Sequence, residues 1–145
     1  EKTIDNISSD SAVQQSREIA VKILLADNDP ETRSTVTKHL ESLDYSICET
    51  TNGEETIAKA FTYSPELILL DLEIPKIDGY QVCKMLKGNS ATEIIPIIII
   101  TRFRTKAEKI NALESGADDY IEKPFDLDEL VARIKMVSRR VAINH

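Results

Sequence analysis

The sequence has few of the residues that build metal clusters or disulfide frameworks. Its 145 residues include two cysteines and two histidines, and their spacing does not match that of zinc ligands. We expect Cys48 and Cys83 to be reduced and largely buried, which fits a cytoplasmic location. No apolar run approaches the roughly 20 residues of a membrane helix. Residues 1–20 also lack the apolar core of a signal peptide.

Positive charge is scarce as well. The chain has 18 Lys and Arg residues against 25 Asp and Glu residues, a formal net charge of −7. Because phosphate contacts need a basic face, this balance argues against direct binding of nucleic acid. The hydrophobic and charged fractions, 41% and 30%, are those of a globular protein, and the length fits one domain.

Short apolar runs alternate with segments of helical periodicity. The expected strands are residues 21–26, 45–50, 67–70, 96–100 and 119–122. The expected helices are 30–43, 54–63, 79–86, 105–115 and 126–137. This alternation predicts an α/β fold with a parallel sheet and helices on both faces. The helical spacing also predicts buried stripes that include Leu43, Phe61 and Met85 with Leu86.

Polar side chains stand at the carboxyl ends of four of these strands. They are Asp27-Asn28-Asp29, Asp71, Thr101 and Lys123. Because the strands are expected to be parallel, these ends meet at one edge of the sheet, where open α/β sheets bind ligands.

Such a cluster permits a narrow range of chemistry. Neighbouring carboxylates repel unless a cation lies between them, and a hard oxygen cluster suits Mg²⁺. An ionised carboxylate such as Asp71 can attack phosphorus and form an acyl phosphate. The hydroxyl of Thr101 and the ammonium of Lys123 would then stabilise the phosphoryl oxygens.

Four motifs in this order resemble the receiver domain of bacterial two-component response regulators. They are ILLADND at 23–29, LILLDLEIPKIDGY at 67–80, IPIIIIT at 95–101 and GADDYIEKPFDLDEL at 116–130. The resemblance implies a flavodoxin-like, doubly wound sheet of five parallel strands in the order 2-1-3-4-5, with five helices on both faces. The resemblance covers residues 21–140, the expected receiver domain. The polar composition of residues 1–20 predicts a flexible leader or linker, and 141–145 are expected to form a C-terminal tail.

The resemblance also implies roles for the strand-end residues. Asp71 accepts a phosphoryl group from a histidine kinase or phosphotransfer protein, and Thr101 and Lys123 bind that group. Mg²⁺ is held by Asp27, Asn28, Asp71 and the backbone carbonyl of Glu73. The Lys123–Pro124 peptide is expected to be cis. The domain is expected to be a phosphate-accepting signal module rather than an enzyme, beyond its own phosphorylation and dephosphorylation.

A switch and an output surface are further implications of the resemblance. Tyr120 resembles the aromatic residue that turns inward when Thr101 moves toward the phosphate. The change is expected to reach helix 105–115, strand 119–122 and helix 126–137. This face is expected to control an output domain outside the chain or a partner, and to form a homodimer. Asp118 and Asp119 with Arg133, Arg139 and Arg140 would either form ion pairs in such a dimer or a solvated surface.

Two residues depart from the family's pattern. Asn28 stands where a second acid is usual, which predicts weaker Mg²⁺ binding. Arg102 follows Thr101 where a small residue is common, and its guanidinium would crowd the pocket, pair with the phosphate, or pair with Glu73. These departures leave open a second hypothesis, a receiver-like protein-interaction module with impaired phosphorylation.

Several strand-end residues also fit simpler structural roles. Taken singly, Asp71 is compatible with a turn cap, and Asp27 and Asp29 with the acidic start of a helix. Two other function classes match less of the sequence. Asp71-Leu72-Glu73 loosely resembles phosphatases with an Asp nucleophile, although their nucleophile follows the first strand. A flavin carrier would share only the fold.

Overall fold

The computed structural model describes residues 20–144, with side chains described up to residue 139. Its strands are β1 (Lys22–Ala26), β2 (Ser46–Thr50), β3 (Leu67–Leu70), β4 (Ile97–Thr101) and β5 (Asp119–Glu122). Its helices are α2 (Pro30–Ser42), α3 (Gly53–Thr62), α4 (Gly79–Lys87), α5 (Lys106–Glu114) and α6 (Leu127–Asn144). Each of these elements lies within a few residues of its predicted start, and α6 extends through residues predicted as a tail. The predicted leader, 1–20, lies almost wholly outside the described residues.

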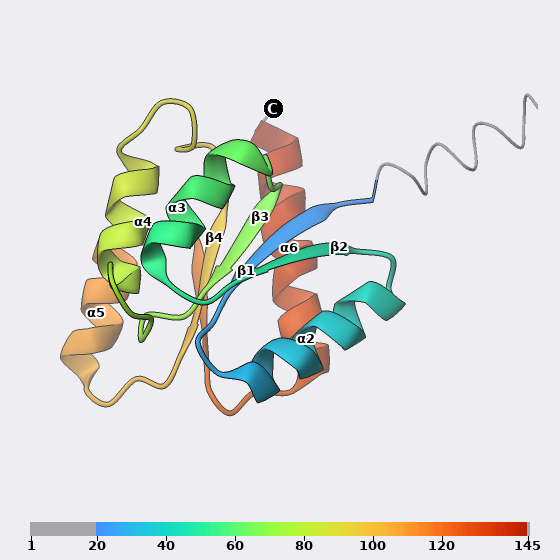
Figure 1. Ribbon diagram of the computed structural model, residues 1–145, viewed down its shortest axis with the longest axis horizontal. Coiled ribbons are helices and arrows are strands. Elements are labelled where there is room, and N and C mark those ends of the chain that lie inside the picture. Colours follow the sequence, from blue (N-terminus) through green and yellow to red (C-terminus); the bar gives the residue numbers. More distant parts are fainter. Residues whose placement is uncertain (1–19, 145) are drawn as a thin grey trace, which may run out of the picture.

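The five strands form one parallel sheet in the order β2-β1-β3-β4-β5. This is the predicted flavodoxin-like order. Helices α3, α4 and α5 cover one face and α2 and α6 cover the other (Figure 1). The inner strands are buried on both faces, which explains why their sequences are continuously aliphatic.

Side chains from successive strand residues enter two separate cores. Leu24 and Ala26 pack with α3, α4 and α5, whereas Ile23 and Leu25 pack with α2 and α6. This alternation follows from the two-residue period of a strand. Because each face has its own core, β1 and β3 are fixed from both sides, and so are the residues that follow them.

Four helices begin at a side chain that caps the free backbone N–H groups. The caps are Asp29, Asn52, Asp78 and Thr105, and each accepts a hydrogen bond from a backbone N–H two or three residues later. These residue types are the preferred helix caps. Asp29 therefore has a structural role that the sequence had left open.

Several predicted buried positions are exposed instead. Leu43, Phe61 and Met85 are each close to half exposed, whereas Leu86 is buried. The predictions for Phe61 and Met85 were wrong because each helix turns only a narrow stripe toward the sheet. The prediction for Leu43 was wrong because α2 ends at Ser42 and Leu43 is its C-cap residue. Ile110 and Leu113 of α5 are also about half exposed, which leaves an apolar patch on that helix.

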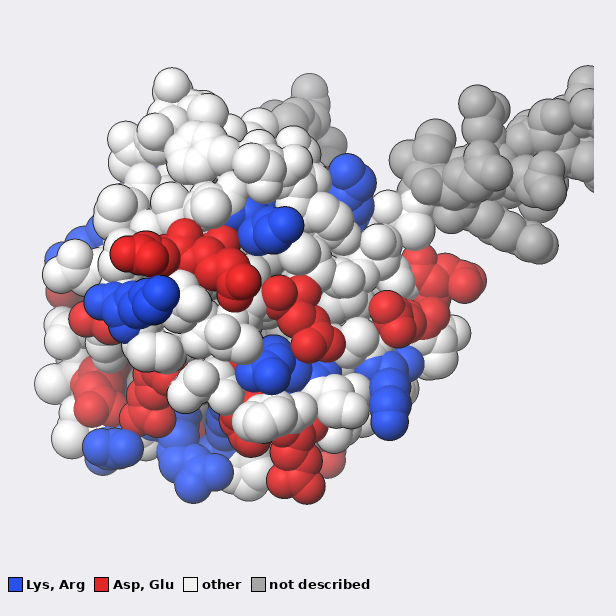
Figure 2. Space-filling view, viewed as in Figure 1, with Lys and Arg blue, Asp and Glu red and all other residues white. Residues whose placement is uncertain are grey.

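Acidic and basic side chains are interspersed on the face drawn in Figure 2. Both cysteines are free, Cys83 buried and Cys48 half-buried. None of the helices in residues 20–144 combines the length and apolar character needed to cross a membrane.

The start of α3 requires a glycine because the backbone of another loop approaches it. A Cβ added at Gly53 would lie 1.9 Å from the backbone oxygen of Ile77. We predict that Gly53→Ala lowers the free energy of unfolding by about 2 kcal/mol, the usual cost of overpacking. Urea unfolding measures this loss. Gly88→Ala is the control, because its Cβ would approach no atom closer than 3.1 Å. Equal losses in the two variants would contradict the packing explanation.

Candidate functional site

The carboxyl ends of β1 and β3 bring two carboxylates together. Ala26 and Leu70, the last residues of these strands, are paired in register. The Asp71 N–H donates to the carbonyl of Ala26 at 2.9 Å. The next residues, Asp27 and Asp71, therefore lie side by side at the edge of the sheet. Both are buried, with Asp27 completely inaccessible to solvent.

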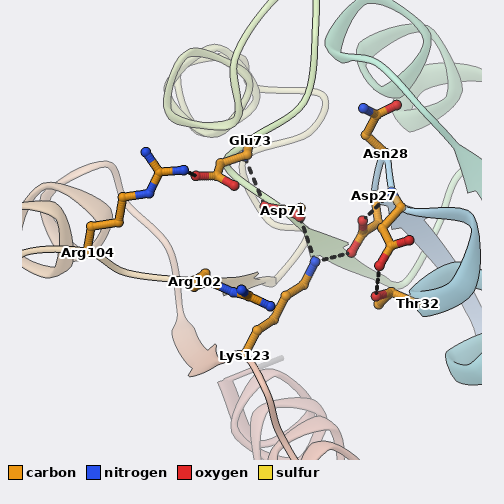
Figure 3. Close-up of a pocket in the computed structure, with 9 residues that line it drawn as sticks. Asp27, Asn28, Thr32, Asp71, Glu73, Arg102, Arg104 and Lys123 are labelled. Atoms are coloured by element: carbon orange, nitrogen blue, oxygen red, sulfur yellow. Dashed lines mark hydrogen bonds and ion pairs between the residues drawn. The ribbon is translucent and has the colours of Figure 1, made fainter.

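Lys123, which follows β5, lies between these two carboxylates. Its Nζ is 2.8 Å from Oδ2 of Asp27 and 2.8 Å from Oδ2 of Asp71 (Figure 3). The Lys123 side chain is only 13% exposed. The Lys123–Pro124 peptide is cis, as predicted. One buried ammonium thus neutralises part of the charge of two buried acids.

The remaining oxygens of the two acids are also satisfied. Oδ1 of Asp71 accepts from the Thr101 hydroxyl at 2.9 Å and from the Glu73 N–H at 2.9 Å. Oδ1 of Asp27 accepts from the Asp29 N–H at 2.8 Å. The structure therefore brings Asp27, Asp71, Thr101 and Lys123 into one hydrogen-bonded group. A donor on either side of Asp71 holds its carboxylate in a fixed direction.

Burial and pairing shift the pKa values in this group. Burial raises the pKa of Asp27, even though the hydrogen bond from Lys123 lowers it. Burial by itself lowers the pKa of Lys123, but its hydrogen bonds to Asp27 and Asp71 outweigh that effect and leave the pKa raised. Lys123 therefore remains a cation at neutral pH.

A cavity of about 340 Å³ opens beside this group. Its lining residues are Asp27, Asn28, Asp29, Thr32, Asp71, Glu73, Arg102, Arg104 and Lys123. Asn28 is exposed, and its amide lies apart from the contacts that join Asp27, Lys123 and Asp71 (Figure 3).

The oxygen donors around the cavity match Mg²⁺ in kind. Asp27 and Asp71 offer carboxylates, and the Asn28 amide and the Glu73 carbonyl offer neutral oxygens. Within residues 20–139, no three acids, histidines or cysteines gather into a metal-binding cluster. A metal at this site would therefore depend on two carboxylates and on neutral ligands.

Two residues on the loop after β4 make contacts that the sequence did not predict. Arg104, rather than Arg102, pairs with Glu73, with its Nη2 3.0 Å from Oε2 (Figure 3). Phe103 is buried, and its ring meets the ring of Tyr120 edge-on, with centroids 5.4 Å apart. Phe103 and Arg104 follow Thr101 by two and three residues, and this closeness is the feature of the sequence that could have identified them.

The charged residues near β5 are paired within the chain. Arg133 Nη1 lies 3.1 Å from Asp119 Oδ1, and its Nη2 lies 3.1 Å from Glu129 Oε2. Lys87 Nζ lies 3.0 Å from Asp118 Oδ2. These acids therefore have partners in the isolated domain, and a dimer that used Asp119 or Asp118 would have to exchange or share them.

The raised pKa of Asp27 gives the stability of the protein a defined pH dependence. In the folded chain this carboxyl ionises at a higher pH than in the unfolded chain, so stability falls as pH rises from the unfolded pKa, about 3.9, through the folded value. We predict that Asp27→Asn removes this fall. In urea unfolding, the free energy of unfolding of the variant minus that of the wild type should increase as the pH rises from 4 to 7.

Asp29 provides a control of opposite sign. Hydrogen bonds from the Thr32 hydroxyl and the Glu31 N–H lower the pKa of Asp29. Its contribution is present above its unfolded pKa and lost in acid. Asp29→Ala should therefore be less stable than the wild type by a constant amount above about pH 5, and this loss should shrink as pH falls below about 4. A relative stability of Asp27→Asn that stays flat or falls with pH would contradict the assigned cause.

Comparison with known proteins agrees with this arrangement. Residues 23–135 match the model of the response regulator receiver domain. The chain is 39% identical over 119 residues to the DNA-binding dual master transcriptional regulator RpaA of Synechocystis sp., covering 82% of the chain and 49% of RpaA. It is 40% identical over 121 residues to the transcriptional regulatory protein ResD of Bacillus subtilis, covering 83% of the chain and 49% of ResD. The chain thus spans about half the length of these curated relatives.

Solved structures show the same likeness. A two-component response regulator from Clostridium difficile is 34% identical, with a TM-score of 0.77 over 83% of this chain and 97% of that one. The receiver domain of the sensor histidine kinase PA1611 from Pseudomonas aeruginosa is 26% identical, with a TM-score of 0.77 over 82% of this chain and 98% of that one. In that structure a magnesium ion is coordinated in the active site cleft. With its sheet order, its strand-end group and these matches, the chain belongs to the response regulator receiver domain family, whose members act in two-component signalling.

Proposed function

We propose that Asp71 is the residue that accepts the phosphoryl group in this receiver domain. The observation that supports this most directly is the setting of its carboxylate, which Thr101 and Lys123 contact from two sides at 2.9 and 2.8 Å. The donor is a phosphohistidine of a histidine kinase or phosphotransfer protein, as expected for a two-component partner. A cytoplasmic location remains a prediction of the sequence.

Asp71 and its neighbours have different roles in the phosphoryl transfer. A carboxylate oxygen of Asp71 attacks phosphorus, and the bond from phosphorus to the donor breaks. Lys123 then donates to a phosphoryl oxygen in place of the carboxylate, and Thr101 turns its hydroxyl from Asp71 to a second phosphoryl oxygen. Asp27, Asn28, Asp71 and the Glu73 carbonyl would hold Mg²⁺, which would supply positive charge to the transferring group. The domain is thus a stoichiometric acceptor rather than a turnover enzyme.

The output follows from the movement of Thr101. Tyr120 packs against Phe103, two residues beyond Thr101, so a shift of Thr101 toward a phosphate disturbs that contact. The disturbance reaches α5, β5 and α6, the face expected to change between two packings. Ile110 and Leu113 supply exposed apolar surface on α5 for a homodimer or partner. A DNA-binding output domain outside this chain is consistent with its similarity to RpaA, a DNA-binding regulator.

The second candidate is a receiver that binds partners without efficient phosphorylation. The observation that favours it is Asn28, which supplies a neutral oxygen to a cavity where, among the described side chains, Asp27 and Asp71 are the buried carboxylates. A site with one negative charge fewer binds Mg²⁺ more weakly. The two candidates differ in whether Asp71 takes up a phosphoryl group at all.

Phosphorylation of Asp71 is tested with a small phosphodonor. Incubation with acetyl phosphate and Mg²⁺ should add the mass of one phosphoryl group to the wild type, because the Asp71 carboxylate is aligned for attack. Asp71→Asn should add none, since the amide is not a nucleophile. Asp78→Asn, an exposed helix-capping acid, is the matched control and should be phosphorylated like the wild type. An equal mass gain in Asp71→Asn and the wild type would reject Asp71 as the acceptor.

Restoring an acid at position 28 should strengthen the metal site. We predict that Asn28→Asp lowers the Kd for Mg²⁺ by about tenfold, because a third carboxylate adds a full negative charge beside the cation. Calorimetric titration of the unphosphorylated protein measures the change. The exposed Asp44→Asn variant is the control and should leave the Kd unchanged. An unchanged Kd in Asn28→Asp would place the Asn28 side chain outside the metal site.

A further inference from the structure

Arg102 differs in its partners from the other cations around the cavity. Lys123 pairs with Asp27 and Asp71, and Arg104 pairs with Glu73. Within the part of the chain whose side chains are described, no ion pair or hydrogen bond connects Arg102 to a carboxylate. Its five guanidinium N–H donors are therefore available for a ligand.

Arg102 is also close to the phospho-acceptor. It directly follows Thr101, whose hydroxyl lies 2.9 Å from Asp71 Oδ1. It lines the same cavity as Asp71 and Lys123. Arg102 and Lys123 also line a second, neighbouring cavity of about 260 Å³. Because no carboxylate among the described side chains pairs with Arg102, its charge is available to an anionic ligand that enters this cavity.

The acids of the cavity do not provide that anion. Asp27 and Asp71 share Lys123, and Glu73 pairs with Arg104. Asp29 accepts from the Thr32 hydroxyl at 2.7 Å and from the Glu31 N–H at 3.1 Å. Each acidic side chain is thus engaged elsewhere, and Arg102 remains the cation positioned for an incoming group.

We propose that Arg102 is a ligand of the phosphoryl group and compensates in part for the charge missing at Asn28. This inference rests on the proposed phosphorylation of Asp71. The planar guanidinium donates two N–H groups to two phosphoryl oxygens, a geometry that a lysine cannot reproduce. A fixed positive charge from Arg102 lowers the amount of Mg²⁺ that the transfer requires.

The transfer balances without any further reactant. With acetyl phosphate, an Asp71 oxygen forms the new bond to phosphorus. The bond between phosphorus and the acetyl oxygen breaks, and its electron pair leaves with acetate. Arg102 remains protonated throughout, and its role is to hold the phosphoryl oxygens and neutralise their charge.

The first test compares two neighbouring arginines. The rate of phosphorylation by acetyl phosphate is measured over a series of Mg²⁺ concentrations. Arg102→Ala should lower the rate about tenfold at limiting Mg²⁺, the usual effect of losing a hydrogen bond to a charged group, and less at saturating Mg²⁺. Arg102→Lys should give an intermediate rate. Arg104→Ala, which removes an equal charge from the same cavity, should stay within about twofold of the wild type, as expected for an exposed ion pair.

The link to Asn28 is tested by a double-mutant cycle. In an Asn28→Asp background the third carboxylate strengthens Mg²⁺ binding, so Arg102→Ala should cost less than it does in the wild-type background. Equal costs in the two backgrounds would overturn the compensation. All variants are compared by circular dichroism, and Arg102→Gln replaces Arg102→Ala if the latter unfolds.

A binding experiment that does not depend on the transfer completes the test. Inorganic phosphate is titrated into the metal-free protein while the NMR signals of Thr101 and Lys123 are followed. Arg102→Ala should weaken phosphate binding about tenfold, and Arg104→Ala should leave it nearly unchanged.

The outcomes separate this inference from the proposed function. An Arg102→Ala variant that is phosphorylated as fast as the wild type, or faster, would overturn the inference. The guanidinium would then either not contact the phosphoryl group or hinder its entry. Equal losses in Arg102→Ala and Arg104→Ala would also overturn it. If the wild type takes no phosphoryl group on Asp71, the proposed function fails, while the phosphate titration still decides whether Arg102 binds the anion.

Discussion

The ammonium of Lys123, held between the buried carboxylates of Asp27 and Asp71, is the contact on which this edge of the sheet depends. Parallel pairing of β1 with β3 forces the two acids together, and the aliphatic strands beneath them exclude the water that would screen their repulsion. Removing one partner of a buried ion pair generally costs about 3–5 kcal/mol, since the other charge is left uncompensated. The same repulsion makes the site suited to a cation, and under the proposed function a phosphoryl group on Asp71 would become a new acceptor for Lys123.

The balance of charge around that contact has shifted in this chain. Asn28 supplies one acid fewer at the mouth of the cavity, while Arg102 and Arg104 add two cations to its walls. Glu73 neutralises Arg104, so the positive charge on the cavity wall that lacks a carboxylate partner among the described side chains is that of Arg102. Metal charge and protein charge can substitute for one another at a phosphoryl group, because both act by neutralising its oxygens. In the proposed account, Arg102 therefore compensates in part for the charge that Asn28 lacks.

Much of the fold was predictable from the sequence because it follows from local rules. Continuous aliphatic runs identified the buried strands, their alternation with helices fixed the parallel sheet, and parallel strands place their ends at one edge. The group of Asp27, Asp71, Thr101 and Lys123 followed from that topology and from the family's motifs. Side-chain partners did not follow. Whether Arg102 or Arg104 reaches Glu73 depends on the path of the loop after β4. Whether Phe61 or Met85 is buried depends on the rotation of each helix about its axis, and an apolar spacing of three or four residues does not fix that rotation to within one position.

The most direct test of phosphorylation at Asp71 is to locate the acyl phosphate chemically. Borohydride reduces an aspartyl phosphate to homoserine, so the phosphorylated protein is reduced, digested and sequenced by mass spectrometry. We predict homoserine at position 71 and at no other aspartate. Homoserine at Asp27 or Asp29 instead, or a phosphoryl group on a residue outside this edge of the sheet, would contradict the assignment.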